Sequence, residues 1–197
     1  SSIKELSPEW AADDKNLPKV FVIDEDQVGF RKGWWKNSSD QTLLYLCAPN
    51  ARFGHALAVS CKLKSTTASF AIGIESGKTK FRLALNAENS SWSLEMFTKT
   101  RQRYEVIEQG EIKGDSEQPH ELLISVAHDQ LVAKIDGTDV AGNLGIELPR
   151  DWQPRESSNT EQLFIALRDE CEFQNVQIGC QINYDISGNF GVGKVFN

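Results

Sequence analysis

The amino-acid sequence predicts an all-β protein, an antiparallel two-sheet β-sandwich of about eleven strands. Apolar residues recur at every second position in one segment after another, which is the period of a half-buried strand. Turn residues separate these segments at intervals of roughly 8 to 12 residues, as in sandwiches and barrels. No helical periodicity is sustained for ten residues. A chain of 197 residues, 40% hydrophobic and 25% charged, has the length and composition of one soluble domain.

The domain organisation follows from where these segments begin and end. Residues 1–17 are rich in turn formers and predict a lead-in segment, and residues 18–184 predict the sandwich domain. Residues 185–197 carry Gly188, Gly191 and Gly193, which indicate a glycine-rich tail or linker and favour a place in a larger multidomain chain.

The expected strands can be assigned in order along the chain. They cover residues 20–24, 41–48, 55–64, 69–75, 79–87, 91–97, 104–112, 120–127, 130–135, 162–167 and 172–182. The clearest is 79–87, where Phe81, Leu83 and Leu85 alternate with polar or small residues and should face the core. Asp136-Gly137 predicts a hairpin turn. The irregular stretch 142–159 is expected to cap the core with Trp152.

Charge and hydropathy exclude several classes of partner. The formal net charge is −7, whereas binding to a nucleic-acid backbone requires a basic surface. No apolar run approaches the roughly 18 residues of a membrane helix, so we expect neither a nucleic-acid partner nor a membrane span.

The four cysteines, Cys47, Cys61, Cys171 and Cys180, do not have the spacing of a zinc site. Alternation directs Cys61 and Cys180 inward. Cys171 and Cys180 fall on one expected strand, roughly 30 Å apart, which is beyond disulfide reach. The even number permits other disulfides and equally permits four thiols, and we expect an extracellular or periplasmic protein.

Three stretches resemble the concanavalin A-like (laminin G-like, jelly-roll) lectin and glucanase superfamily. The first runs from Ala71-Ile72-Gly73-Ile74 through strands 81–85 and 92–95. The second is the strand pair 120–126 and 131–135, which ends in the Asp-Gly turn. The third, residues 163–168 and 171–176, is similar to the final pair that closes beside the first strands. The resemblance implies a jelly-roll fold, but this superfamily includes lectins, carbohydrate-binding modules, hydrolases, lyases and adhesive modules.

Catalytic motifs give little support for an enzyme. Family 16 glycosidases of this superfamily carry Glu-x-Asp-x-x-Glu on one strand, and this chain has no such motif. A glycoside hydrolase or polysaccharide lyase of another type remains the alternative, with carboxylates such as Glu75, Glu95 or Glu105 on a shared face. The three histidines, His55, His120 and His128, are expected to be solvated, at strand starts or turns.

The best candidate binding surface comes from the alternation around residues 79–97. If Phe81, Leu83 and Leu85 face inward, Arg82 and Asn86 face outward beside Glu75 on the preceding strand and Glu95 on the following one. Such a face can hydrogen-bond sugar hydroxyls, with Arg82 and Glu95 as a cross-strand pair. The alternative is an ordinary solvated face with one surface ion pair.

Trp34 and Trp35 are the second candidate. Consecutive side chains on a strand point in opposite directions, so one Trp should enter the core while the other remains near the surface, where it can stack on a sugar ring. The flanking Arg31, Lys32 and Lys36 instead indicate the charged edge of a sheet.

No cofactor is predicted. Calcium, which many members of the superfamily bind, is the candidate metal, with Asp24, Asp26, Asp136 or Asp139 as ligands. The sequence therefore predicts a non-catalytic binding module with a glycan or protein ligand. The alternatives are an enzyme of unfamiliar type and a structural or protein-interaction domain.

Overall fold

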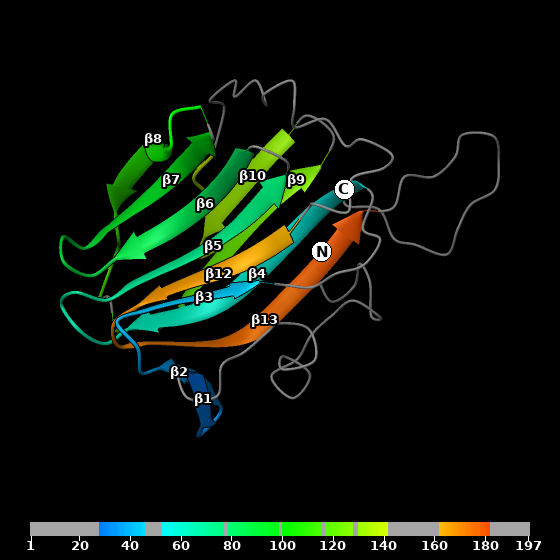
Figure 1. Ribbon diagram of the computed structural model, residues 1–197. Coiled ribbons are helices and arrows are strands. Elements are labelled where there is room, and N and C mark those ends of the chain that lie inside the picture. Colours follow the sequence, from blue (N-terminus) through cyan, green and yellow to red (C-terminus); the bar gives the residue numbers. More distant parts are fainter. Residues whose placement is uncertain are drawn as a thin grey trace.

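The computed structural model describes residues 28–45, 53–76, 79–98, 100–115, 117–127, 130–141 and 162–181. These residues form 13 strands in two antiparallel sheets, and no helix occurs among them (Figure 1). The predicted all-β sandwich is confirmed.

One sheet has seven strands and the other has six. The seven-stranded sheet has the order β1 (Val28–Arg31), β2 (Trp34–Asn37), β13 (Cys171–Gln181), β4 (Phe53–Leu63), β9 (His120–Ala127), β10 (Gln130–Ile135) and β11 (Thr138–Asp139). The six-stranded sheet has the order β3 (Gln41–Tyr45), β12 (Gln162–Arg168), β5 (Ser69–Ser76), β6 (Thr79–Asn86), β7 (Ser91–Thr98) and β8 (Arg103–Glu111).

The last two strands close the sandwich. Strand β12 lies between β3 and β5, and β13 lies between β2 and β4. Strands from the start and the end of the chain are thereby joined in both sheets, as the resemblance implied.

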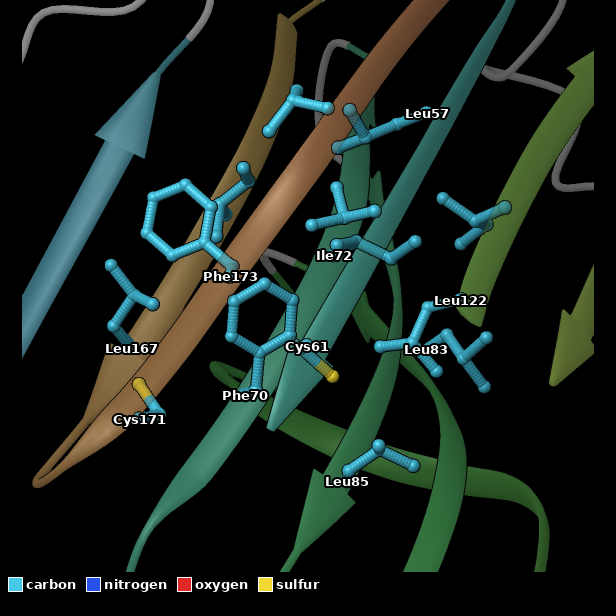
Figure 2. Packing of buried hydrophobic residues seen from close by; sticks show 14 of the residues in the cluster. Leu57, Cys61, Phe70, Ile72, Leu83, Leu85, Leu122, Leu167, Cys171 and Phe173 are labelled. Atoms are coloured by element: carbon cyan, nitrogen blue, oxygen red, sulfur yellow. The ribbon is translucent and has the colours of Figure 1, made fainter. Parts of the chain in front are cut away.

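The core lies between the two sheets and follows the predicted alternation. Phe81, Leu83 and Leu85 are fully buried on β6. Figure 2 shows the side chains that fill the space between the sheets. Phe173 joins the two layers, because its ring lies 6.3 Å from that of Trp35 and 5.7 Å from that of Phe70. Burying one such side chain contributes about 1.5–3 kcal/mol, so this packing holds the two sheets together.

The N-terminal part of the described chain contains a hairpin whose strands the sequence did not delimit. Strands β1 and β2 have only four residues each, too few to show a clear period. Lys32 and Gly33 have φ values of +54° and +82°, which fit a two-residue turn of type I′. Trp34 and Trp35 lie on a strand, β2, as expected. The edge strand of the sheet is β1, however, and not the strand that carries the tryptophans. The two-residue strand β11 was also missed.

The hairpin turn predicted at Asp136 and Gly137 is present and joins β10 to β11, with φ values of +51° and +76°. Next to this turn, His120 is buried, so the expectation of a solvated histidine was wrong for this residue. It faces inward in phase with Leu122. Its Nδ1 lies 2.8 Å from Asp136 Oδ2 and its Nε2 lies 3.3 Å from the backbone oxygen of Asp115.

Two cysteines can be placed in the core. Cys61 and Cys171 are buried free thiols. The inward position of Cys61 was expected from alternation, and a free Cys171 agrees with the rejection of a disulfide between Cys171 and Cys180. Burial raises the pKa of both thiols, that of Cys171 to about 12. Cys47 and the side chain of Cys180 lie outside the described part.

Several predictions fall on residues that the structure does not describe: the strand at 20–24, the segment 142–159 with Trp152, His128 and the side chain of His55. The domain limits at residues 18 and 184 therefore stay predictions. Within the described ranges, no helix is long and apolar enough to cross a membrane.

Candidate functional site

Strand register places the predicted site residues of β5, β6 and β7 on the outer face of the six-stranded sheet. Arg82 lies opposite Gly73 on one side and Glu95 on the other. Glu75 lies opposite Lys80. Because the core residues occupy the alternate positions, these polar side chains share the face that points away from the second sheet. We call it the Arg82 face.

Arg82 is held by two groups, the Glu95 carboxylate and the Tyr104 ring. Its Nε donates a hydrogen bond to Glu95 Oε2 at 2.6 Å, and its Nη2 lies 2.5 Å from the same oxygen. The other oxygen, Glu95 Oε1, accepts a hydrogen bond from Ser93 Oγ at 2.6 Å. On β8, Tyr104 places its ring centroid 3.6 Å from Arg82 Cζ, which is a cation–π contact. The expected cross-strand pair forms, and its geometry is fixed on several sides.

Sequence reasoning missed Tyr104. Tyr104 is two strands from Arg82 and two residues out of register with it, so alternation along a single strand does not reveal their diagonal contact. Phe97, opposite Tyr104, lies 5.2 Å from it between ring centroids. An aromatic residue at the start of the expected strand 104–112 was the only available signal.

The charges on the Arg82 face are paired. Lys80 Nζ lies 3.0 Å from Glu75 Oε2 and 5.8 Å from the ring centroid of Phe97. Together with Arg82 and Glu95 this makes two cations and two carboxylates, so the cluster is formally neutral.

On the side of Arg82 towards β5 and β12, the face carries small residues and the ring of Phe164. The row through Arg82 continues to Gly73 and then to Phe164 of β12. Phe164 is buried, with 3% of its surface exposed, although it does not belong to the core between the sheets. An added Cβ at Gly73 would lie 2.1 Å from the Phe164 ring. The neighbouring row has Ala71 and Ala84.

Asn86 belongs to the same face but to a different local structure. Its Oδ1 accepts a hydrogen bond from the backbone N–H of Glu88 at 2.9 Å, in the turn between β6 and β7. The side chain therefore stabilises the end of the strand. It lies four residues from Arg82 along β6.

Of the carboxylates proposed for the enzyme alternative, Glu75 and Glu95 share the Arg82 face, whereas Glu105 does not. Glu105 lies opposite Met96, which packs against the core, so Glu105 is on the other side of the sheet from Glu95. A hydrogen bond from Arg101 lowers the pKa of Glu105. Glu75 and Glu95 are two strands apart, roughly 10 Å across the sheet. With their two-residue offset, the Cα atoms of Glu75 and Glu95 are roughly 12 Å apart, whereas retaining and inverting hydrolysis need carboxyl groups about 5 Å and about 6.5–9.5 Å apart.

The two tryptophans lie on the seven-stranded sheet, so the structure does not bring them to the Arg82 face. Trp35 is buried against Phe173, and its Nε1 has no hydrogen-bond partner among the described residues. Trp34 is half-buried on the outer face, where Lys62 Nζ lies 4.3 Å from its ring centroid. One ring therefore enters the core and the other remains near the surface, as alternation predicted.

The expected calcium ligands are either engaged or not described. Asp136 interacts with His120 and accepts a hydrogen bond from the backbone N–H of Glu121. Asp139 accepts one from the backbone N–H of Ala141. In the described segments, no group of three or more His, Cys, Asp or Glu side chains is arranged to hold a metal ion. Asp24 and Asp26 lie outside these segments.

Comparison with known proteins identifies the fold. No protein-family profile matches the chain, and no curated protein matches it in sequence. Among solved structures it is similar to the carbohydrate-binding module CBM66 from Bacillus subtilis, with a TM-score of 0.54 and 16% identity over 77% of this chain and 90% of that one.

Two enzymes have a similar fold. A non-specific endo-β-1,3(4)-glucanase from family GH16 matches with a TM-score of 0.56 and 12% identity over 79% of this chain and 74% of that one. An alginate lyase from Pseudomonas aeruginosa matches with a TM-score of 0.51 and 12% identity over 86% and 91%. The chain therefore has the concanavalin A-like jelly-roll fold that the sequence resemblance implied.

Proposed function

We propose that this protein is a non-catalytic carbohydrate-binding module and that the Arg82 face binds the glycan. The observation that carries the proposal is the state of Arg82. Glu95 and Tyr104 fix its guanidinium, yet its Nη1 group has no partner within the described part of the chain. A fixed donor group at a surface loses little conformational freedom on binding, which favours affinity for a hydroxylated ligand.

The chemistry of the face favours an uncharged sugar. The ion pairs Arg82–Glu95 and Lys80–Glu75 leave no net charge. The guanidinium can donate to sugar hydroxyl oxygens, and the half-buried Ala84 in the neighbouring row puts no bulky side chain in the way of a sugar ring. Binding sites for small molecules commonly combine a few fixed polar groups with apolar surface, and the exposed Val106, opposite Glu95, borders this one.

The comparisons support the same class of function. CBM66 is named as a carbohydrate-binding module, and the chain covers most of its length. The similar glucanase and lyase act on glycans, but the carboxylates considered for catalysis in this chain are separated. A location outside the cytoplasm, extracellular or periplasmic, is part of this proposal, because polymeric glycans are found mainly there.

A glycan array followed by calorimetry tests the proposal. We expect the protein to bind at least one neutral glycan and Arg82→Ala to weaken that binding more than tenfold, since a hydrogen bond from a charged donor contributes about 1.5–3 kcal/mol. Arg103→Ala is the matched control, because Arg103 is an exposed cation on β8. Repeating the titration with calcium and with a chelator tests whether a metal is required.

Two results would contradict the proposal. One is the absence of binding to any neutral glycan in either condition. The other is a bound glycan whose affinity is the same for the wild-type protein, Arg82→Ala and Arg103→Ala. In either case protein–protein interaction becomes the leading alternative.

A further inference from the structure

Basic side chains gather on the outer face of the seven-stranded sheet, on the side of the sandwich opposite the Arg82 face. Arg31 lies opposite Trp34 in the β1–β2 hairpin, and Lys36, Glu172 and Lys62 follow one another across β2, β13 and β4. We call the surface formed by Arg31, Lys36, Lys62 and Lys64 the cationic face. Figure 1 shows β1 and β2 at one end of the molecule beside β13.

The charge of this surface is opposite to that of the rest of the chain. The whole chain has 21 basic and 28 acidic residues, a net charge of −7. The four residues of the cationic face, Lys32 at the hairpin tip and Glu172 sum to a net charge of +4, and the exposed Glu121, opposite Ser60, borders them on β9. The remaining chain therefore carries −11. Asp169 and Glu170 are close to one end of the face, where the backbone N–H of Lys64 donates to the backbone oxygen of Glu170.

The basic groups are held in place by the sheet. Glu172 is almost buried, and its carboxylate contacts Lys36 Nζ at 2.5 Å and Lys64 Nζ at 3.7 Å. Lys62 rests on the ring of Trp34. Because these contacts restrict the lysine side chains before binding, less conformational entropy is lost when an anion binds.

From this arrangement we propose that the cationic face binds an anionic polysaccharide, one that carries carboxylate or sulfate groups along its chain. This second proposal rests on the proposed function in one respect, that the partner is a carbohydrate. A polysaccharide with repeated charges can contact several basic groups spread over neighbouring strands without needing an apolar pocket. Release of its counterions supplies much of the binding free energy, as it does for other polyanions.

The same residues disfavour other acidic partners. A membrane surface is bound through exposed aromatic or aliphatic side chains together with basic ones, but Phe30 shares the other face of the hairpin with Trp35. A stable protein interface needs a desolvated apolar centre, and single-stranded nucleic acid needs free aromatic rings for base stacking. Among the described residues of this face Trp34 supplies the one aromatic ring, and it is already in contact with Lys62.

Titration against polygalacturonate, dextran sulfate and uncharged dextran at 50 to 200 mM NaCl tests this proposal. Four contacts at about 0.7 each predict a slope of log affinity against log salt near −2.8. The variant Arg31→Ser/Lys62→Ser should make that slope shallower, about −1.4, and weaken binding about 60-fold at 50 mM salt. Lys62→Met in place of Lys62→Ser retains an aliphatic chain over Trp34, and thermal unfolding of both variants confirms that they fold.

The matched control is Arg103→Ser/Lys113→Ser, which removes the same charge from exposed positions on and after β8. We expect this control to bind the acidic polysaccharide with the wild-type slope. Equal losses in both double variants would overturn the proposal, as would a wild-type protein that binds no acidic polysaccharide at 50 mM salt.

Vesicles containing phosphatidylserine and a single-stranded oligonucleotide serve as further probes. Salt-dependent binding to either of these, without binding to the polysaccharides, would also overturn the proposal in favour of that partner. Binding of a neutral glycan that depends on Arg82 is measured separately, so the outcome at the Arg82 face does not decide the outcome at the cationic face.

Discussion

Gly73 is the position at which the structure makes the sharpest prediction about stability. A Cβ built there would lie 2.1 and 2.5 Å from two carbons of the Phe164 ring and 2.6 Å from the backbone oxygen of Phe81. Phe164 is buried, so its ring has little space to move away, and the Phe81 oxygen belongs to the sheet itself. Overpacking of this kind costs about 1–3 kcal/mol, and we expect Gly73→Ala to lie at the upper end.

A double-mutant cycle separates the two sources of this cost. Phe164→Ala alone should destabilise by roughly 3–5 kcal/mol, as for other buried phenylalanines. The double variant should be more stable than the sum of the single effects predicts, by about 1–2 kcal/mol, because two of the three short contacts disappear with the ring. The remaining contact, with the Phe81 oxygen, should keep Gly73→Ala unfavourable even when Phe164 is absent.

Urea unfolding followed by tryptophan fluorescence measures all four species, with the m-value as a check that each unfolds in the same way. Gly29→Ala is the matched control, since no atom lies within 4 Å of a Cβ built there; we expect a change of less than about 1 kcal/mol. A midpoint for Gly73→Ala equal to that of the wild type would refute this reasoning, as would single effects that simply add.

Three further predictions concern titratable groups. Burial raises the pKa of Cys171 to about 12 from its ordinary value of 9.0, so above pH 9 the unfolded chain loses the thiol proton before the folded chain does. The free energy of unfolding should therefore fall by up to about 1.4 kcal/mol per pH unit towards pH 12. Urea unfolding at several pH values should show that Cys171→Ala removes this contribution to the pH dependence. His120→Phe should cost about 1–2 kcal/mol in thermal unfolding, because the hydrogen bonds of His120 are lost; no change in melting temperature would count against a structural role. Arg101→Ala should raise the pKa of Glu105 towards its ordinary range in an NMR titration, since the hydrogen bond from Arg101 lowers it, and an unshifted titration would show that this bond does not form in solution.

Much of the fold was predictable because alternation is a local signal. On β6 each core residue and each outward residue was assigned correctly, and the Arg82–Glu95 pair followed because β6 and β7 are joined by a short turn. His120 was assigned wrongly because its burial depends on Asp136, sixteen positions away. A polar residue at the start of a strand gives no local sign that a distant carboxylate will be its partner.

The parts of the candidate sites that the sequence missed depend on long-range register. Tyr104 reaches Arg82 diagonally across β7, so this contact depends on the register of three strands. Lys62 meets Trp34 only because β13 comes between β2 and β4. Strand order of this kind joins the two ends of the chain, and composition or spacing alone does not determine it.

The two outer faces of the sandwich differ in a way that makes their functions separable. On the Arg82 face every charged group of the cluster has an opposite partner within 3.0 Å, so an approaching ion meets little net field and hydrogen bonding decides what binds. On the cationic face one nearly buried carboxylate stands among several cations, so the field extends into solvent and screening by salt weakens it. Binding to the first face should therefore change little with salt, whereas binding to the second should weaken steeply. A glycan bound in both ways would need neutral and charged sugars along one chain, and its affinity would fall in two separable steps when Arg82 and then Lys62 are replaced.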